Sequence, residues 1–337
     1  MVEIANPIAN RCSSLEGVLD VVSSSEVRHR GKWTRSQRMK NNVIWGLASL
    51  ALAGARHLPP KLRTALGWWL GALAHVAARG ARRQALENVA LALPHLHPSA
   101  QRALVRRCFR TLGEVLGETL GLLGGPDAWQ RLPLTSQATA TLESARSEGR
   151  GVIFASAHLG PWERVAASIA AAGVPFTVLT RDSYDPRFSR VQNRMRRGAG
   201  VGVIRRSTSR PTSATRGVLR ALGRGDVVGV VMDLRARVTS CEAPFLGTPA
   251  LTALGPARIA LRTGAPVVVG SAAPAGTEAG GKWVVTATRI VTDDLFNFPD
   301  GARELTARIN AELSRRILAM PHAWVWMHPR WAGQGEL

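Results

Sequence analysis

The stretch from Gly151 to Glu163, GVIFASAHLGPWE, contains the residues best suited to carry out chemistry. An apolar run leads into a turn of small residues, where His158 is followed five positions later by Glu163. A neutral imidazole can take a proton from a hydroxyl group, and a carboxylate on its second ring nitrogen fixes the tautomer and stabilises the imidazolium. We therefore predict that His158 is a general base and that Glu163 is the carboxylate that holds it in position.

This spacing alone also fits a structural histidine, because such pairs arise often by chance. On an unbroken helix, two residues five apart point about 140° away from each other. The pair therefore needs the turn at Gly160 and Pro161, with Pro161 in the first turn of a helix. The spacing also differs from the HExxH pattern that aims two imidazoles at zinc, so neither a metal ion nor another cofactor is expected. The sequence has no convincing serine elbow, which favours direct attack by the hydroxyl of an acceptor.

Arginines are concentrated between Arg181 and Arg224, where twelve of them face only Asp182 and Asp185. The planar guanidinium fork matches phosphate and carboxylate oxygens. Arg181, directly after a predicted strand, is the first candidate for binding an anionic substrate, and Arg197 is another. The alternative is a solvated basic face.

Two further positions are candidates for substrate binding. Asp233 ends a predicted strand and could position an arginine or an acceptor group, or simply cap a turn. Arg258 lies in a helix that begins near Pro256 and could face an anion at the helix N-terminus, although a plain surface role is the alternative. Three tryptophans near the C-terminal end are expected to pack in the core: Trp324, Trp326 and Trp331.

The elements that must position these residues change character along the chain. Up to about Gly125 the pattern is helical, with Ser99 as a predicted cap before an apolar stripe. From Gly149 onward, β-rich runs alternate with helical segments, which predicts an α/β fold with a central mixed sheet covered by helices. We expect residues 126–331 to form this core, continuous with the preceding helices. The predicted strands are 151–156, 174–180, 227–233, 266–270 and 282–290.

Residues 1–40 are polar and basic and lack the apolar run of a secretory signal, which predicts a flexible tail. The thirteen uncharged residues from Val43 to Ala55 fall short of the roughly 20 needed to cross a bilayer, and Thr64 to Ala78 repeats the pattern with two tryptophans. These segments predict helices in the membrane interface and an N-terminal helical membrane-associating extension over residues 41–125. The alternative is that both helices pack on the protein's own core.

Composition limits the classes of partner. The 337 residues are 45% hydrophobic and carry a formal net charge of +21, which calls for an anionic membrane, an acidic carrier protein or a nucleic acid. The arginines are not interleaved with aromatic residues as a nucleic-acid stacking platform requires, so we expect no specific nucleic acid. A nucleic-acid-binding protein and a non-catalytic membrane-surface protein remain the alternatives of a different class. Three scattered cysteines favour a reducing, cytosolic setting.

Five blocks of sequence together resemble a known family. They are RRQALENVALALP (82–94), GRGVIFASAHLGPWE (149–163), LRALGRGDVVGVVMD (219–233), APFLGTPALTALGPARIALRTGAPVV (243–268) and WVWMHPRW (324–331). In this order, from about Trp45 to Trp331, the chain resembles the lipid A late acyltransferases of lauroyl and myristoyl type, within the lysophospholipid acyltransferase superfamily. The resemblance implies that His158 and Glu163 form the catalytic dyad.

The resemblance also implies an activity and a location. A fatty acyl group would move from an acyl carrier protein thioester, or from acyl-CoA, to a hydroxyl of an anionic membrane lipid, in this family a lipid A precursor. The alternative acceptors are another phospholipid, a lysolipid or a glycolipid. The enzyme would work at the cytoplasmic face of the inner membrane as a peripheral or single-pass protein.

Overall fold

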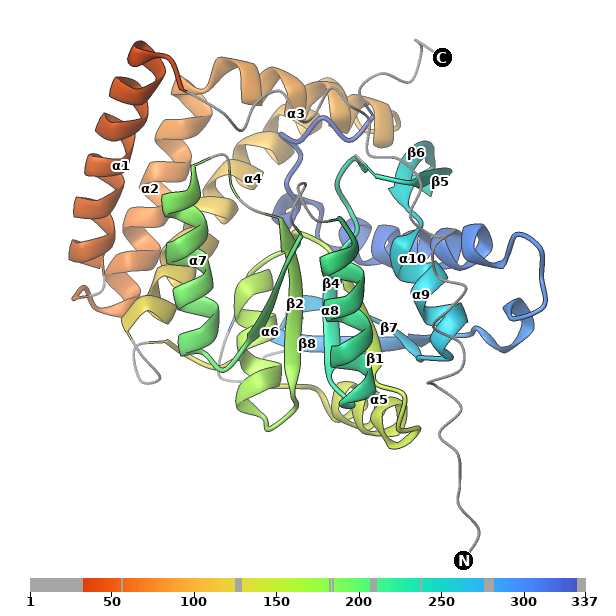
Figure 1. Ribbon diagram of the computed structural model, residues 1–337. Coiled ribbons are helices and arrows are strands. Elements are labelled where there is room, and N and C mark those ends of the chain that lie inside the picture. Colours follow the sequence, from red (N-terminus) through yellow and green to blue (C-terminus); the bar gives the residue numbers. More distant parts are fainter. Residues whose placement is uncertain are drawn as a thin grey trace, which may run out of the picture.

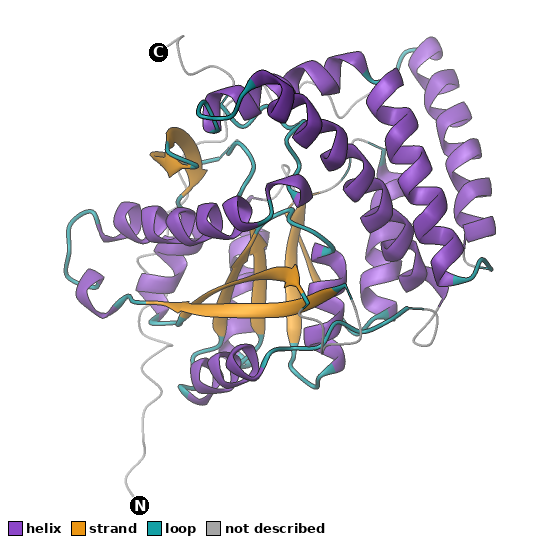
Figure 2. Cartoon of the chain, turned by 180° about the vertical axis from the view of Figure 1, so that it is seen from behind, coloured by secondary structure: helices purple, strands orange, loops and turns teal. Residues whose placement is uncertain are grey.

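A six-stranded mixed sheet forms the centre of the protein (Figures 1 and 2), which confirms the predicted α/β fold. The computed structural model describes residues 33–55, 57–124, 129–181, 183, 185–206, 211–236, 238–275 and 282–331, so residues 1–32 of the expected tail lie outside the described residues. The strand order is β3-β2-β4-β1-β7-β8, and only the β7–β8 pair is antiparallel. The strands are β1 (Val152–Ser156), β2 (Phe176–Arg181), β3 (Gly202–Arg206), β4 (Val227–Val231), β7 (Val267–Pro274) and β8 (Trp283–Ile290).

Five of these strands fall where the sequence predicts them. The runs VIFAS in β1 and VVGVV in β4 are apolar and almost wholly buried, as expected for parallel strands covered on both faces. The strand β3 was not predicted from the sequence, and its residues are only half-buried. A separate antiparallel hairpin, formed by β5 (Ser240–Phe245) and β6 (Thr248–Ala253), was not predicted either.

The connecting helices lie on opposite faces of the sheet. The chain moves from β1 to β2 and β3 in one direction across the sheet and returns to β4 and β7 in the other. Right-handed crossovers therefore place α6 (Trp162–Ala171) and α7 (Pro186–Gly198) on one side, and α8 (Pro211–Gly223) and α9 (Gly255–Thr263) on the other, as Figure 1 shows around β2. The connection after β1 leads to one side of the sheet, and the connection after its neighbour β4 leads to the other, so the switch point of the sheet lies between these two strands. Ligands of open α/β sheets bind beyond the carboxyl ends of the strands at such a switch point.

Two further helices complete the core. α5 (Ser136–Ser147) packs on β8, and α10 (Gly301–Ala319) contacts β5, β7 and α9.

Four helices precede the core: α1 (Arg35–Ala55), α2 (Pro60–Ala77), α3 (Arg79–Ala92) and α4 (Pro98–Thr119). α1 begins eight residues before the predicted start, so residues 35–40 are helical and do not belong to a tail. The predicted cap of α4 at Ser99 is wrong. His97 is the cap, because Pro98 starts the helix and the His97 side chain accepts a hydrogen bond from the Ser99 backbone N–H.

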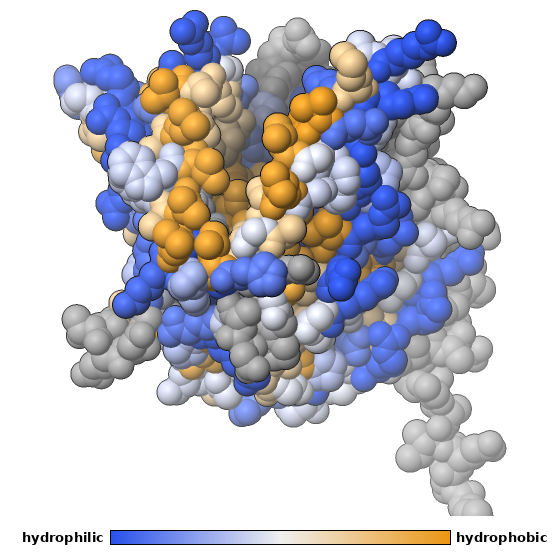
Figure 3. Space-filling view, turned by 90° about the vertical axis from the view of Figure 1, so that its left-hand side faces the viewer, coloured by the Kyte–Doolittle hydropathy of each residue, from blue (hydrophilic) through white to orange (hydrophobic). Residues whose placement is uncertain are grey.

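The outer surfaces of α1 and α2 are apolar. Figure 3 shows two apolar ridges on this side of the molecule, with a hollow between them. The exposed large apolar residues, which we call the apolar face, are Met39, Val43, Ile44, Leu47 and Leu50 on α1 and Leu62, Leu66, Trp69, Leu70, Leu73 and Val76 on α2. Within the described ranges, no helix is both long enough and apolar enough to span a bilayer.

Candidate active site

His158 and Asp233 lie side by side at the carboxyl edge of the sheet. Strand register places them there: Ser156 of β1 pairs with Val231 of β4, and each of the two polar residues follows two positions later. The His158 Nδ1 atom is 3.0 Å from Asp233 Oδ1, and the His158 backbone N–H donates to Asp233 Oδ2 at 2.8 Å. A carboxylate can only accept, so Nδ1 carries the proton and Nε2 is the basic nitrogen.

Exposure and charge suit these two residues to different roles. The Asp233 side chain is completely buried, whereas the His158 side chain is 25% exposed, so the imidazole is the accessible member of the pair. Burial would raise the pKa of Asp233, but the charge of His158 and hydrogen bonds from His158 and Trp324 lower it. Burial would lower the pKa of His158, but Asp233, helped by Glu163 and opposed by Arg196, raises it above its ordinary value.

A sharp turn after β1 carries the chain past the imidazole. Gly160 has φ +58°, in the left-handed region that suits glycine. Pro161 is the N-cap of α6 and therefore lies one residue before the helix, where the sequence analysis had placed it inside the first turn. The Trp162 ring meets the His158 ring edge to face at 5.1 Å, which limits rotation of the imidazole.

Glu163 has a different partner from the one predicted. Arg196 of α7 binds its carboxylate with two groups, Nε at 2.9 Å and Nη2 at 2.5 Å. The prediction that Glu163 accepts a hydrogen bond from the second nitrogen of His158 is wrong, because that nitrogen donates to Asp233 and α6 turns Glu163 toward α7. Glu163 still faces the site closely enough for its charge to act on His158.

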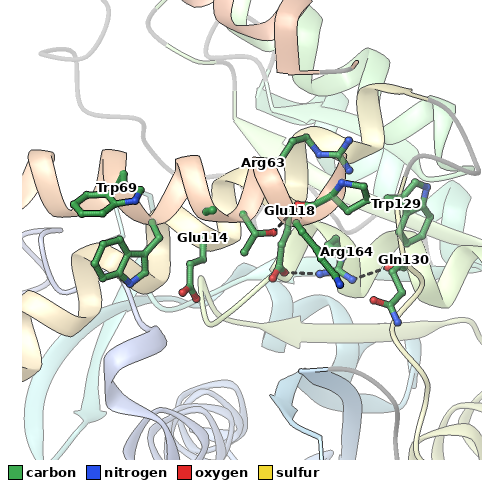
Figure 4. A pocket seen from close by; sticks show the side chains of 12 residues that line it. Arg63, Trp69, Glu114, Glu118, Trp129, Gln130 and Arg164 are labelled. Atoms are coloured by element: carbon green, nitrogen blue, oxygen red, sulfur yellow. Dashed lines mark hydrogen bonds and ion pairs between the residues drawn. The ribbon is translucent and has the colours of Figure 1, made fainter. Parts of the chain in front are cut away.

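A cavity of about 570 Å³ lies between α2, α4 and α6, and the residues that line it include one that anchors α6 (Figure 4). On its wall Arg164, the residue after Glu163, binds Glu118 of α4 and the Gln130 backbone oxygen. Consecutive residues of α6 are thus held by different neighbours. Together these contacts fix the direction in which Glu163 points.

The structure separates the other predicted substrate-binding residues. Asp233 is buried against His158 and is therefore not available to a substrate. Arg181 is exposed at the end of β2, on the same edge of the sheet as His158, and Arg197 is exposed on the outer side of α7. Arg258 lies on α9, and its charge acts on Cys241 of the β5–β6 hairpin.

Two residues of the site were missed by reasoning from sequence. The Trp324 indole N–H donates to Asp233 Oδ2 at 2.7 Å, although the tryptophan cluster was expected only to pack in the core. A buried indole N–H needs an acceptor, and that requirement was the available signal. Arg196 was hidden among many arginines. It lies beside Met195 on the buried side of α7, so helical periodicity could have marked it.

The arrangement can accept a proton at one defined atom. Asp233 and Trp162 hold the imidazole so that the unprotonated Nε2 is available to a ligand, and the buried carboxylate stabilises the imidazolium once it forms. Glu163 and Arg196 add an ion pair beside this base. Such a site suits deprotonation of a hydroxyl group that attacks an activated carbonyl.

Comparisons with known proteins place the chain in a family. A model of the family described as bacterial lipid A biosynthesis acyltransferase matches residues 32–332, a range that includes every residue of the site. The chain is 22% identical over 275 residues to the lipid A biosynthesis palmitoleoyltransferase of Escherichia coli (strain K12), covering 81% of this chain and 86% of that relative. It is 28% identical over 159 residues to the lipid A biosynthesis myristoyltransferase of the same strain, covering 46% and 49%.

Proposed function

The chain belongs to the bacterial lipid A biosynthesis acyltransferase family and is an acyltransferase, and we propose that it transfers a fatty acyl group from a thioester to a hydroxyl of a lipid A precursor. The observation that carries this proposal is the His158–Asp233 pair at the switch point of the sheet, with the imidazole accessible and the carboxylate buried. The names of the matched relatives support a lipid A acceptor.

In the proposed reaction, Nε2 of His158 removes the proton of the acceptor hydroxyl as its oxygen attacks the thioester carbonyl. The new C–O bond forms, the C–S bond breaks, and the imidazolium returns the proton to the departing thiolate. Asp233 stabilises the imidazolium throughout. No acyl-enzyme intermediate is needed.

Glu163 takes a second role in this proposal. Its carboxylate, held by Arg196, contributes negative potential next to His158 and raises the pKa of the imidazole together with Asp233. The ion pair also offers an acceptor and a donor to the polar headgroup of the substrate. Glu163 therefore orients the acceptor and strengthens the base, while Asp233 fixes the tautomer.

The donor is proposed to be the thioester of an acidic acyl carrier protein. Three exposed arginines on α7, which we call the arginine stripe, follow at spacings of four and three residues and so share one helix face: Arg190, Arg194 and Arg197. In the described part of the chain, none of them forms an ion pair. The same helix carries Arg196 into the site, so a carrier protein docked on the stripe would deliver its thioester near His158.

Membrane association is proposed to occur through the apolar face of α1 and α2, at the cytoplasmic face of the inner membrane. Leucine, valine and isoleucine side chains there would enter the headgroup boundary, as the apolar faces of interfacial helices do. The net charge of +21 favours an anionic surface.

The test is an acyl transfer assay with the full chain in mixed micelles, an acyl carrier protein thioester and a lipid A precursor. Mass spectrometry of the product should show one added acyl group. His158→Ala should abolish the product, and Glu163→Gln should reduce the rate by about 100-fold, the size of effect expected when a reacting group is misplaced. Full activity of His158→Ala would refute the mechanism, and acylation of a different lipid only would refute the acceptor.

A further inference from the structure

The carboxylate of Asp233 is held by three donors, of which one comes from the far end of the chain. Oδ1 faces Nδ1 of His158, and Oδ2 accepts from the His158 backbone N–H and from the Trp324 indole at 2.7 Å. Without the indole, both remaining donors to Asp233 among the described residues would come from His158 itself, and no described group outside that residue would hold the carboxylate. Trp324 therefore determines how Asp233 faces the imidazole.

Trp324 is itself fixed to the turn that carries His158. Leu159 and Trp324 form an antiparallel bridge, and the Gly160 N–H donates to the Ala323 oxygen at 3.0 Å. The indole is fully buried against Phe245, and the Cys108 thiol donates to the Trp324 backbone oxygen. The indole therefore keeps a constant position relative to His158.

Two polar side chains tie the C-terminal segment, residues 324–331, to the rest of the fold. Asn88 of α3 donates to the backbone oxygens of Trp326 and His328, both at 2.7 Å. Arg330 is buried and donates to the backbone oxygen of Leu234, the residue after Asp233. Backbone and side-chain hydrogen bonds thus connect the C-terminal segment both to the residue after Asp233 and to the turn after His158.

We propose that Trp324 is a positioning residue of the reaction, whose indole N–H holds Asp233 in the orientation that binds Nδ1–H of His158 and leaves Nε2 toward the substrate. This inference rests on the proposed function for its kinetic consequence. It assigns a chemical task to the C-terminal segment, which the sequence analysis treated as core packing.

A purely structural role would give a different result from a positioning role. If Trp324 only filled space, replacement by another aromatic ring would lower thermal stability and leave the titration of His158 unchanged. If its N–H orients Asp233, loss of that hydrogen bond must change how His158 titrates. The charged groups that face the imidazole are Asp233, Glu163 and Arg196, and none of them is altered by the change.

The test compares Trp324→Phe with Trp326→Phe. Phenylalanine keeps an aromatic ring in the core but removes the indole N–H together with part of the ring volume, and the second variant controls for that lost volume. Trp326 is the matched control, because it is equally buried, meets the Trp324 ring edge to face at 4.8 Å, and donates to the Pro321 backbone oxygen and not to Asp233. We expect Trp324→Phe to lower kcat by about 10- to 100-fold, the usual cost of losing a partner that orients a functional histidine, with KM within about twofold.

The pH profile is the second measurement. A carboxylate that no longer faces Nδ1–H stabilises the imidazolium less, so the pKa of His158 should fall and the acidic limb of kcat/KM in Trp324→Phe should move to lower pH. Trp326→Phe should keep the wild-type kcat and limb even if its melting temperature falls. The proposal would be overturned if Trp324→Phe kept the wild-type kcat and the wild-type acidic limb of kcat/KM. It would also be overturned if the two variants lost kcat equally.

A measurement without substrate separates this inference from the proposed function. NMR of the full chain with 15N-labelled histidine, assigned with His158→Gln, reports the tautomer and titration of His158 directly. We expect a hydrogen-bonded Nδ1–H signal in the wild type and in Trp326→Phe, and a displaced or missing signal in Trp324→Phe. This result would stand even if the acceptor were not a lipid A precursor, and an unchanged signal in Trp324→Phe would refute the positioning role.

Discussion

Individual residues at this site divide acid–base work between one accessible group and one buried group. His158 must be unprotonated to act as a base, and its pKa is raised, so the rate should rise with pH through that raised pKa and not through the ordinary value near 6.5. The limb of the pH profile therefore reports the environment that Asp233 creates.

Asp233→Asn tests this dependence. The neutral amide cannot stabilise the imidazolium, so kcat should fall by about 10³- to 10⁴-fold, as for the equivalent change in a catalytic triad. The pKa of His158 should fall as well, which would move the acidic limb of the residual activity to lower pH. Rates measured between about pH 5 and 9 give both values.

Asp226 provides the matched control for this change. It is also a buried aspartate next to β4, but it lies before the strand and binds Thr177 and Arg224. Asp226→Asn should keep the wild-type pH profile. If the two variants lost activity equally and showed the same acidic limb in their pH–rate profiles, the loss would come from changing a buried carboxylate beside β4. The contact between Asp233 and His158 would then not be its cause.

Among the elements, α7 joins the site to the proposed donor. Arg196 on its inner side binds Glu163, and the arginine stripe on its outer side is exposed toward the proposed acidic partner. Reversing two charges with Arg190→Glu and Arg194→Glu should raise KM for the acyl carrier protein thioester by about tenfold and leave the rate with acyl-CoA unchanged. Steady-state rates with both donors make the comparison.

The control for α7 is a pair of arginines on α8, at the opposite face of the sheet. Arg216 and Arg220 are exposed and four residues apart, like the substituted pair. Their reversal to glutamate changes the net charge equally and should leave KM unchanged. An equal rise in KM for the α8 variant would mean that total charge, and not α7, attracts the donor.

The contact between α2 and α4 depends on glycine. A Cβ built on Gly113 would lie 2.1 Å from the Gly67 backbone oxygen, so the two backbones are in direct contact. Gly113→Ala should force the helices apart and reduce the free energy of unfolding by about 2 kcal/mol. Gly80→Ala on α3, where a Cβ meets nothing within 4 Å, should leave stability unchanged or slightly higher. Thermal unfolding of both variants in the same detergent tests this expectation. Equal melting temperatures for the two variants would contradict the close packing of α2 on α4.

The sequence predicted elements better than it predicted contacts. Apolar runs located β1, β2, β4, β7 and β8, because a buried parallel strand must be apolar along its whole length. No local sequence pattern showed that β4 lies next to β1. This strand pairing brings Asp233 to His158. Glu163 was the closest acid in sequence, so it was assigned the bond that Asp233 makes. Trp324 lies 91 residues from Asp233, beyond any spacing rule.

On the scale of the whole molecule, charge and apolar surface are separated in a way that suits an anionic bilayer. The apolar face lies on α1 and α2, and the cationic ends of these helices, with Arg35 and Arg38 on α1 and Lys61 on α2, border it. Apolar insertion and attraction of cations to anionic headgroups can then act together. In Figure 1, α1 and α2 lie on the same side of the molecule as α7, which carries Arg196 to the site, and this would place the base close to a lipid acceptor.

Substitution of one leucine on α1 and one on α2 tests this orientation. Leu47→Asp with Leu70→Asp should weaken binding to phosphatidylglycerol vesicles by about tenfold per residue, since each loses roughly 1.4 kcal/mol of apolar transfer and adds a negative charge. Leu318→Asp on α10 is the control, because that leucine is 49% exposed and lies outside the apolar face. Vesicle sedimentation at several salt concentrations separates the two contributions, because salt screens charge attraction while apolar insertion persists. If Leu318→Asp weakened binding as much as the paired change, the apolar face would not be the membrane contact, and the acceptor would have to reach His158 from another side.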